Sequence, residues 1–154
     1  MEHFVGHEVI VYGCIQGAQG RREKDVDPLQ LWNARVIAEL PEEGEWPWLV
    51  RGMFALPAPW PQGTYQSQLI HFGASLKDEP GDRAVWEQWL QKFEALLRNL
   101  YWFSAVVHLE TEFEPDRVYR WTPSAAAMQR LYVDSPQCVW EWNRSMHVLR
   151  EQID

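Results

Sequence analysis

Two segments of the chain carry apolar patterns that are typical of a buried strand and of a packed helix. Residues 8–15 are β-branched and apolar on both faces, which favours a central strand. In residues 83–99 large apolar side chains recur at every third or fourth position, so this segment is predicted to be a helix that packs on a sheet, with Asp82 as its cap. The apolar stripe of this helix consists of Trp86, Trp89, Leu90, Phe93, Leu97 and Leu100. On the opposite side, Glu94 and Arg98 are expected to form an ion pair.

Residues 103–113 alternate between apolar and polar side chains, as a strand with one buried face does. The apolar face carries Phe103, Ala105, Val107, Leu109 and Phe113, and the polar face carries Ser104, His108, Glu110 and Glu112. Residues 117–121 follow a turn and are predicted to return beside this strand as a hairpin. The sequence therefore predicts one half-buried strand pair in this region.

Shorter patterns predict the other elements. Asp27 followed by Pro28 has the form of an N-cap and a first helical residue, which predicts a helix over residues 28–40; the same stretch also alternates partly, so a strand is the alternative. Residues 49–56 and 65–76 are predicted strands that pair through the proline-rich connection between them. Beyond residue 122 the chain is predicted to be helical, with one stripe made of Val139, Trp142, Met146 and Leu149.

This order of elements predicts an α+β fold in a single domain spanning residues 1–154. Short connections and right-handed crossovers turn the order strand, helix, strand, strand, helix, strand into a ferredoxin-like antiparallel sheet with both helices on one face. A helical extension is expected at the C-terminus. The polar side chains of His71, His108, Glu110 and Glu112 are expected to lie on the other, open face of the sheet.

Composition and charge narrow the classes of function. The formal net charge of −8 argues against direct binding of nucleic acid, which needs a basic surface, and it suits a basic protein partner. Ten tryptophans among 154 residues are more than a core of this size needs, so some are expected on the surface, where tryptophan is enriched in binding hot spots. No apolar run has the length of a membrane span, and Cys14 and Cys138 form no C-x-x-C pair. We therefore expect a cytoplasmic protein with reduced thiols.

Motifs that would indicate catalysis or a cofactor are missing from the sequence. His108 and Glu110 are two residues apart on a strand and could share a metal ion with His71, but the chain has no H-E-x-x-H, no EF-hand loop and no zinc-type ligand set. It also lacks a G-x-S-x-G elbow and a phosphate-binding loop. We expect no bound metal and no cofactor, and we interpret the polar face of residues 108–113 as solvated.

Three segments resemble small immunity proteins of bacterial polymorphic toxin systems. They are WPWLVRGMFALP, SQLIHFGASLKD and WEQWLQKFEALLRNLYWFSAVVHLETEF, which lie between residues 46 and 113. The resemblance implies a cytosolic protein without catalytic activity that binds and blocks a cognate toxin domain. It assigns a role to no individual residue.

The acidic and aromatic residues of two loops are the candidate contacts for such a partner. The first choice is the loop of residues 42–48, which offers Glu42, Glu43, Glu45, Trp46 and Trp48. The second choice is the turn that contains Asp78, Glu79 and Asp82. Carboxylates would raise the association rate and tryptophans would slow dissociation. The alternative function is a small-ligand-binding protein or hydrolytic enzyme that uses the open sheet face near His71, His108 and Glu110.

Overall fold

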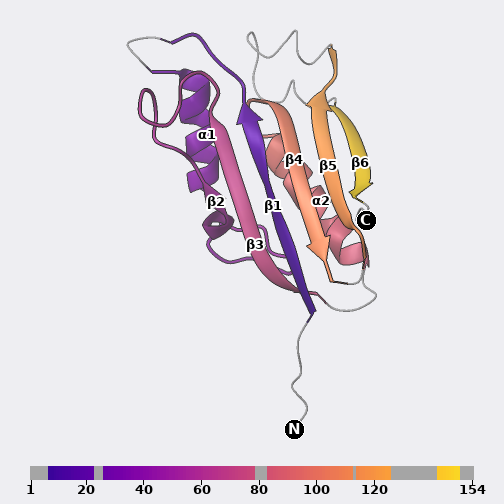
Figure 1. Ribbon diagram of the computed structural model, residues 1–154. Helices are drawn as coiled ribbons and strands as arrows, with labels where there is room; N and C mark the ends of the chain where they lie inside the picture. Colours follow the sequence, from indigo (N-terminus) through magenta and orange to yellow (C-terminus); the bar gives the residue numbers. More distant parts are fainter. Residues whose placement is uncertain (1–6, 23–25, 79–82, 113, 126–141, 150–154) are drawn as a thin grey trace.

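The chain folds into a sheet with helices on one of its faces. The computed structural model describes residues 7–22, 26–78, 83–112, 114–125 and 142–149, and in these residues six antiparallel strands form one sheet in the order β2-β3-β1-β4-β5-β6 (Figure 1). The strands are β1 (His7–Gly17), β2 (Phe54–Ala55), β3 (Leu69–Asp78), β4 (Trp102–Thr111), β5 (Asp116–Pro123) and β6 (Trp142–Leu149). The helices are α1 (Pro28–Ala38) and α2 (Arg83–Leu97), with a short 3-10 helix, η1 (Arg51–Met53), before β2. The predicted α+β class is confirmed. Neither of these two helices is long and apolar enough to cross a membrane.

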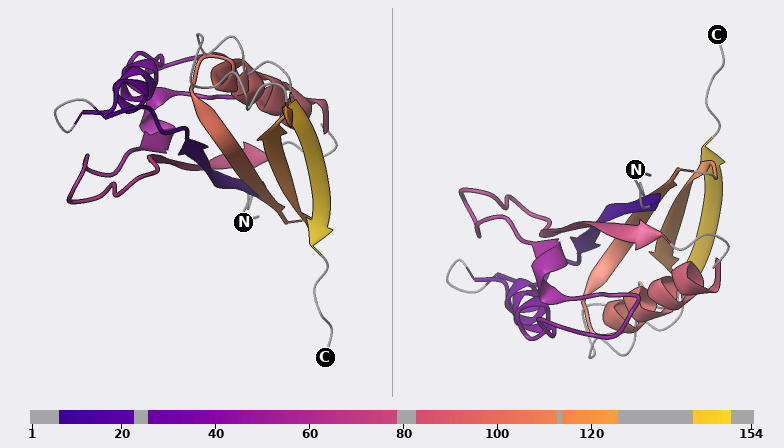
Figure 2. Two further views of the ribbon diagram at one scale, coloured as in Figure 1. Left: turned by 90° about the horizontal axis from the view of Figure 1, so that it is seen from above. Right: turned by 90° about the horizontal axis from the view of Figure 1, so that it is seen from below.

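Helix α2 supplies the centre of the core. Figure 2 shows α1 and α2 on the same side of the sheet, as predicted. The predicted apolar stripe of α2 is buried, and the ring of Phe93 lies 5.1 Å from the rings of both Phe72 on β3 and Trp121 on β5. On β1 the buried side chains include Val9, Val11 and Ile15, whose spacing places them on the face that meets the helices. The core thus joins α2 to strands on both sides of β1.

Helix α1 begins where the sequence predicts, so the strand alternative for residues 28–40 is wrong. The side chain of Asp27 accepts hydrogen bonds from the backbone N–H groups of Leu29 and Gln30, at 2.9 and 3.4 Å, and caps the helix. The buried face of α1 contains a polar residue, Asn33, which is fully buried. The side-chain amide of Asn33 donates to the carbonyl oxygen of Tyr101 and accepts the backbone N–H of Tyr101, each at 2.8 Å. These bonds connect α1 to the residue that precedes β4.

The strand predicted over residues 49–56 is mostly absent. Only Phe54–Ala55 pair with β3, and the preceding residues form η1. The backbone N–H of Arg51 donates to the carbonyl of Pro41 at 2.9 Å, and the N–H of Met53 donates to the carbonyl of Val50 at 3.1 Å. Because these donors already have partners, they are not available to a neighbouring strand. The pairing of β2 with β3 is as predicted.

The predicted C-terminal helix is wrong over residues 142–149, which form β6 and pair with β5. The prediction is also wrong at Thr122 and Pro123, which end β5, whereas residues 126–141 and 150–154, including Cys138 and Val139, lie outside the described residues. The apolar spacing in 142–149 fits a strand as well as a helix, and alternate residues face the same side. Trp142 and Arg144 lie on the side of β6 that meets α2. The guanidinium of Arg98, the residue after α2, is 5.1 Å from the centre of the Trp142 ring. Partners outside the segment therefore decided between the two structures.

Glu94 on α2 connects the helix to β5 and β6 instead of forming the expected ion pair with Arg98. Its Oε2 accepts hydrogen bonds from the indole N–H groups of Trp121, at 2.9 Å, and Trp142, at 3.2 Å. The guanidinium of Arg144 lies 3.5 Å from Oε1 of the same carboxylate, which is largely buried. One carboxylate thus receives donors from two neighbouring strands.

We expect Glu94→Gln to lower the free energy of unfolding by about 1 kcal/mol, since a hydrogen bond to a charged acceptor is stronger than one to a neutral amide. Hydrogen exchange should report faster exchange in β6 and unchanged exchange in β1. Glu87→Gln is the matched control, because it removes a more exposed ion pair between α2 and the same Arg144 and should change stability by less than about 0.5 kcal/mol. Equal effects of the two substitutions would show that Glu94 has no special role in holding β6.

Candidate protein-binding site

The acidic loop, residues 42–48, is fixed to α2 through its backbone. The ammonium group of Lys92 donates hydrogen bonds to the carbonyl oxygens of Glu45 and Pro47, at 2.8 and 2.7 Å. The indole N–H of Trp89 donates to the carbonyl oxygen of Trp48 at 2.9 Å. Three carbonyls of the loop are therefore held by two side chains of one helix. A loop that is held in this way loses little conformational entropy when it binds a partner.

The two tryptophans of the acidic loop have different surroundings. Trp46 is half-buried, and its ring packs edge to face against Trp86 on α2, with 6.2 Å between the ring centres. Trp48 packs against Trp46 in the same manner at 4.9 Å, but 44% of its surface is exposed. Trp46 thus supports the loop from inside, and Trp48 presents an indole to solvent.

The three glutamates of the loop are exposed, and one of them is paired. Glu42 forms an ion pair with Arg51, whose N–H groups also reach back to the end of α1. The carboxylates of Glu43 and Glu45 form no ion pair with any residue that the structure describes. Unpaired carboxylates keep their field directed toward solvent, where it attracts cationic groups.

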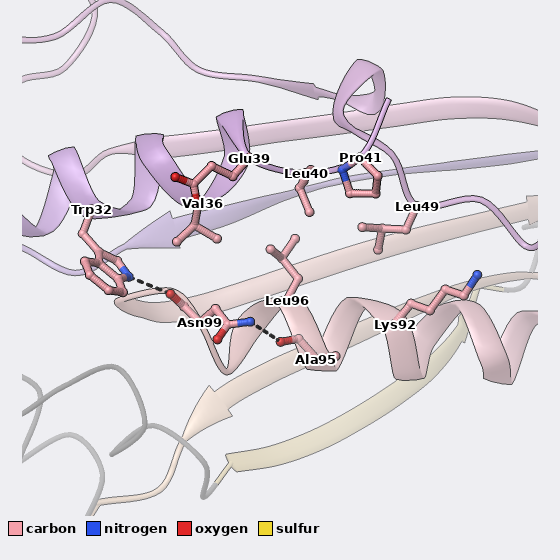
Figure 3. A pocket seen from close by; sticks show the side chains of 10 residues that line it. All are labelled: Trp32, Val36, Glu39, Leu40, Pro41, Leu49, Lys92, Ala95, Leu96 and Asn99. Atoms are coloured by element: carbon pink, nitrogen blue, oxygen red, sulfur yellow. Dashed lines mark hydrogen bonds between the residues drawn. The ribbon is translucent and has the colours of Figure 1, made fainter. Parts of the chain in front are cut away.

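An apolar groove of about 480 Å³, here called the interhelical groove, extends from the acidic loop along the line between α1 and α2. Figure 3 shows its side chains: Lys92 lies at one end, Trp32 lies at the other, and aliphatic side chains line the floor. The lining consists of Trp32, Val36, Glu39, Leu40, Pro41, Leu49, Lys92, Ala95, Leu96 and Asn99. The indole N–H of Trp32 donates to the carbonyl of Asn99 at 2.8 Å. The groove adjoins the loop, because Pro41 and Leu49 on either side of the loop line the groove, as does Lys92, which binds two carbonyls of the loop.

Leu29, Trp32, Val36 and Leu40 recur at helical spacing, so the sequence pattern predicts Trp32 on the apolar stripe of α1 and does not reveal it as a surface residue. In the structure 41% of its surface is exposed, while Asn33 and Ile37 face the core. A buried polar residue at position 33 rotates the helix relative to the orientation that its apolar residues alone suggest. The second predicted contact region is not described, since the side chain of Asp78 and all of Glu79 and Asp82 lie outside the described residues.

The open face of the sheet carries a second group of polar residues around Tyr12. The rings of Tyr12 on β1 and His108 on β4 are stacked, with 4.7 Å between their centres and 4° between their planes. The Tyr12 hydroxyl donates to Oε1 of Glu110 at 2.8 Å, and this hydrogen bond, together with burial, raises the pKa of the Tyr12 hydroxyl above its ordinary value. His108 and Glu110 therefore have protein partners that account for their positions.

The fold separates His71 from His108 and Glu110. His71 on β3 lies beside Cys14, while His108 on β4 lies on the other side of β1 beside Tyr12, two residues before Cys14. Two sheet spacings amount to about 10 Å, so one small ligand does not readily contact both imidazoles. Burial raises the pKa of the Cys14 thiol, which disfavours the nucleophilic thiolate at neutral pH. Of the residues of the alternative enzyme hypothesis, His108 and Glu110 thus lie together beside Tyr12, and His71 lies apart from them.

No group of three or more histidine, cysteine, aspartate or glutamate side chains is arranged to hold a metal ion in the described part of the chain. The expectation that the protein binds no metal and no cofactor stays a prediction. The acidic loop with the interhelical groove is therefore the site to which the geometry points. Comparison of the chain with protein-family models, with curated proteins and with solved structures finds no match.

Proposed function

We propose that this chain is an immunity protein that binds a basic toxin domain through the acidic loop and the interhelical groove, and that it is not an enzyme. The observation that carries the proposal is the loop itself: α2 holds its backbone, while Glu43, Glu45 and the ring of Trp48 are exposed. Such a loop needs little ordering when a partner arrives. The resemblance of residues 46–113 to immunity proteins supports the same function.

In the proposed interface, charged groups and apolar contacts affect different rates of binding. The carboxylates attract a basic surface from a distance and raise the association rate. Trp48 and the floor of the groove then receive apolar side chains of the partner, and this contact slows dissociation. Lys92 does not oppose a basic partner strongly, because its ammonium group is directed at two carbonyl oxygens of the loop.

We also propose that the elements from β1 to β4 are a ferredoxin-like unit to which β5 and β6 are added. Support comes from the chain order β1-α1-β2-β3-α2-β4 together with the sheet order β2-β3-β1-β4. In this arrangement both helices lie on one face, which brings α1 beside α2 and forms the groove. A cytoplasmic location belongs to the same proposal, because an immunity protein meets the toxin inside the cell that it protects.

Reversing the two unpaired charges of the acidic loop tests the electrostatic part of the proposal. We expect the double variant Glu43→Lys, Glu45→Lys to bind the partner with an association rate that is lower by about a factor of ten at low ionic strength. Added salt should remove most of this difference, since the Debye length falls to about 8 Å at 0.15 M. The measurement is surface kinetics on an inactivated form of the protein that the neighbouring gene encodes, which this proposal expects to be a toxin domain.

The matched control is the double variant Glu8→Lys, Glu112→Lys, which changes the net charge equally but on β1 and just after β4, away from the loop. Its association rate should change much less. Equal slowing by both variants would indicate a general field effect, and unchanged rates in the loop variant would remove the loop from the interface. If the neighbouring gene product does not bind the wild-type chain at all, the immunity proposal fails.

A further inference from the structure

Two adjoining hollows at the beginning of α1 have complementary linings. One is polar, has a volume of about 250 Å³ and is lined by Gln19, Gly20, Arg22, Asp27 and Gln66. The other has a volume of about 390 Å³, within the range of small-molecule sites, and its apolar wall includes Leu31, Ala34, Leu56 and Trp60. Arg22 and Asp27 contribute to both hollows, so the two hollows adjoin at these residues.

Arg22 is a cation that is positioned at the junction of the two hollows. Its guanidinium group lies 5.5 Å from the centre of the Trp60 ring and donates a hydrogen bond to the carbonyl oxygen of Tyr65. A guanidinium has five N–H donors, and this one forms no ion pair with any described residue. Apart from the bond to Tyr65, no residue that the structure describes uses these donors, and the contact with Trp60 restricts where the group can lie.

Asp27, the carboxylate that shares the site, is already compensated. Its oxygens accept the backbone N–H groups of Gly20 at 2.8 Å, of Leu29 at 2.9 Å and of Gln30 at 3.4 Å. It is buried at the positive end of α1, which further offsets its charge. Among the described residues that line the two hollows, the charge left for a ligand to neutralise is that of Arg22.

The apolar hollow leaves large side chains exposed. Leu31 is 57% exposed and Trp60 is 40% exposed, although both border the same cavity. Leu31 comes from α1 and Trp60 from the connection between β2 and β3, so the wall is assembled from two segments that are distant in sequence. Exposed apolar side chains around a concave surface are typical of a ligand site.

We propose that the two hollows form one binding site for a small organic acid with an aromatic or branched aliphatic body. The carboxylate pairs with Arg22 on the polar side, and the body lies against Trp60 and Leu31 in the apolar hollow. Among the acids of this class, a planar aromatic carboxylate also stacks on the Trp60 ring. The site lies on the side of α1 that is lined by Gln30, Leu31 and Ala34, whereas the interhelical groove is lined by Trp32 and Val36, so this inference does not depend on the proposed partner.

Isothermal titration calorimetry with two probes of equal shape tests the proposal. Indole-3-acetate should bind to the wild-type chain, and the neutral indole-3-acetamide should bind at least about tenfold more weakly, because it lacks the charge-assisted pair with Arg22. Arg22→Gln should abolish this preference by weakening the acid while leaving the amide unchanged. Ala34→Trp, which fills the apolar hollow, should reduce the affinity for both probes.

Arg21→Gln is the matched control, since it removes the neighbouring exposed arginine, which lines neither hollow. It should keep both affinities, and circular dichroism should show the same fold in all variants. Equal affinity of the acid and the amide for the wild-type chain would overturn the assignment of Arg22. If neither probe binds the wild-type chain, the proposed site is overturned. Equal losses of affinity for the acid in Arg21→Gln and Arg22→Gln would overturn it as well.

Discussion

Phe93→Ala is expected to lower the free energy of unfolding by about 3–5 kcal/mol, the largest stability effect that we predict for this chain. Phe93 has no exposed surface, and its ring lies within 5.6 Å, centre to centre, of Phe72, Trp89 and Trp121. These rings come from β3, α2 and β5 and cannot close over the space that the lost ring would leave. Urea unfolding followed by circular dichroism measures the change.

Gln91→Ala is the matched control for this substitution, because residue 91 is an exposed position on the same helix. It should leave stability within about 0.5 kcal/mol of the wild type. A loss below about 1 kcal/mol in Phe93→Ala would mean that α2 does not occupy the centre of the core. An unchanged midpoint with a changed slope would instead indicate an altered unfolded state.

Trp48→Ala is expected to speed dissociation of the proposed toxin partner about 30-fold, which corresponds to about 2 kcal/mol of binding free energy. Trp48 is the cleaner position for this test because its exposed ring is removed while the carbonyl that accepts the Trp89 indole N–H remains. Substitution of Trp46 would also remove a packing contact with Trp86 and so would mix folding with binding. The dissociation phase of surface kinetics gives the rate directly.

Trp60→Ala serves as the comparison, since it removes another exposed tryptophan that borders neither the acidic loop nor the interhelical groove. Its dissociation rate should equal that of the wild type. A dissociation rate that is unchanged in Trp48→Ala would exclude this tryptophan as a hot spot. If both tryptophan variants dissociate faster to the same degree, the interface extends beyond the surface proposed here.

Several elements follow from local sequence alone. The stripe of α2 repeats at helical spacing over four turns, and no other secondary structure places Trp86, Phe93 and Leu97 on one face. Strand β4 has an equally clear period of two, and its paired strand β5 begins after a short turn. The cap formed by Asp27 is a contact within four residues, so its geometry depends little on the remainder of the fold.

The position of the acidic loop in sequence could also be predicted, but its architecture could not. Its charge and tryptophan content are visible in residues 42–48. That Trp46 packs inward while Trp48 is exposed depends on Trp86, Trp89 and Lys92, which lie about one turn apart on α2. The interhelical groove is likewise invisible in sequence, because its walls come from α1, α2 and the segment around Leu49.

Local sequence by itself determined the helix α2, the strands β1 and β4, the start of α1 and the chemical character of the acidic loop, since in each case the deciding pattern or contact is short-range. Tertiary structure alone decided three further features: β6 in place of a helix, η1 in place of a strand, and the rotation of α1 about Asn33. In each of these the local preference is weak, and a distant partner determines the outcome. Residues 142–149 pair with β5, and the indole N–H of Trp142 donates to Glu94. The backbone N–H of Arg51 donates to the carbonyl of Pro41. Asn33 is buried because the backbone groups of Tyr101 form hydrogen bonds with its side-chain amide. A buried polar group needs a hydrogen-bond partner. Because the two partners are far apart along the chain, no local sequence pattern shows that they will meet.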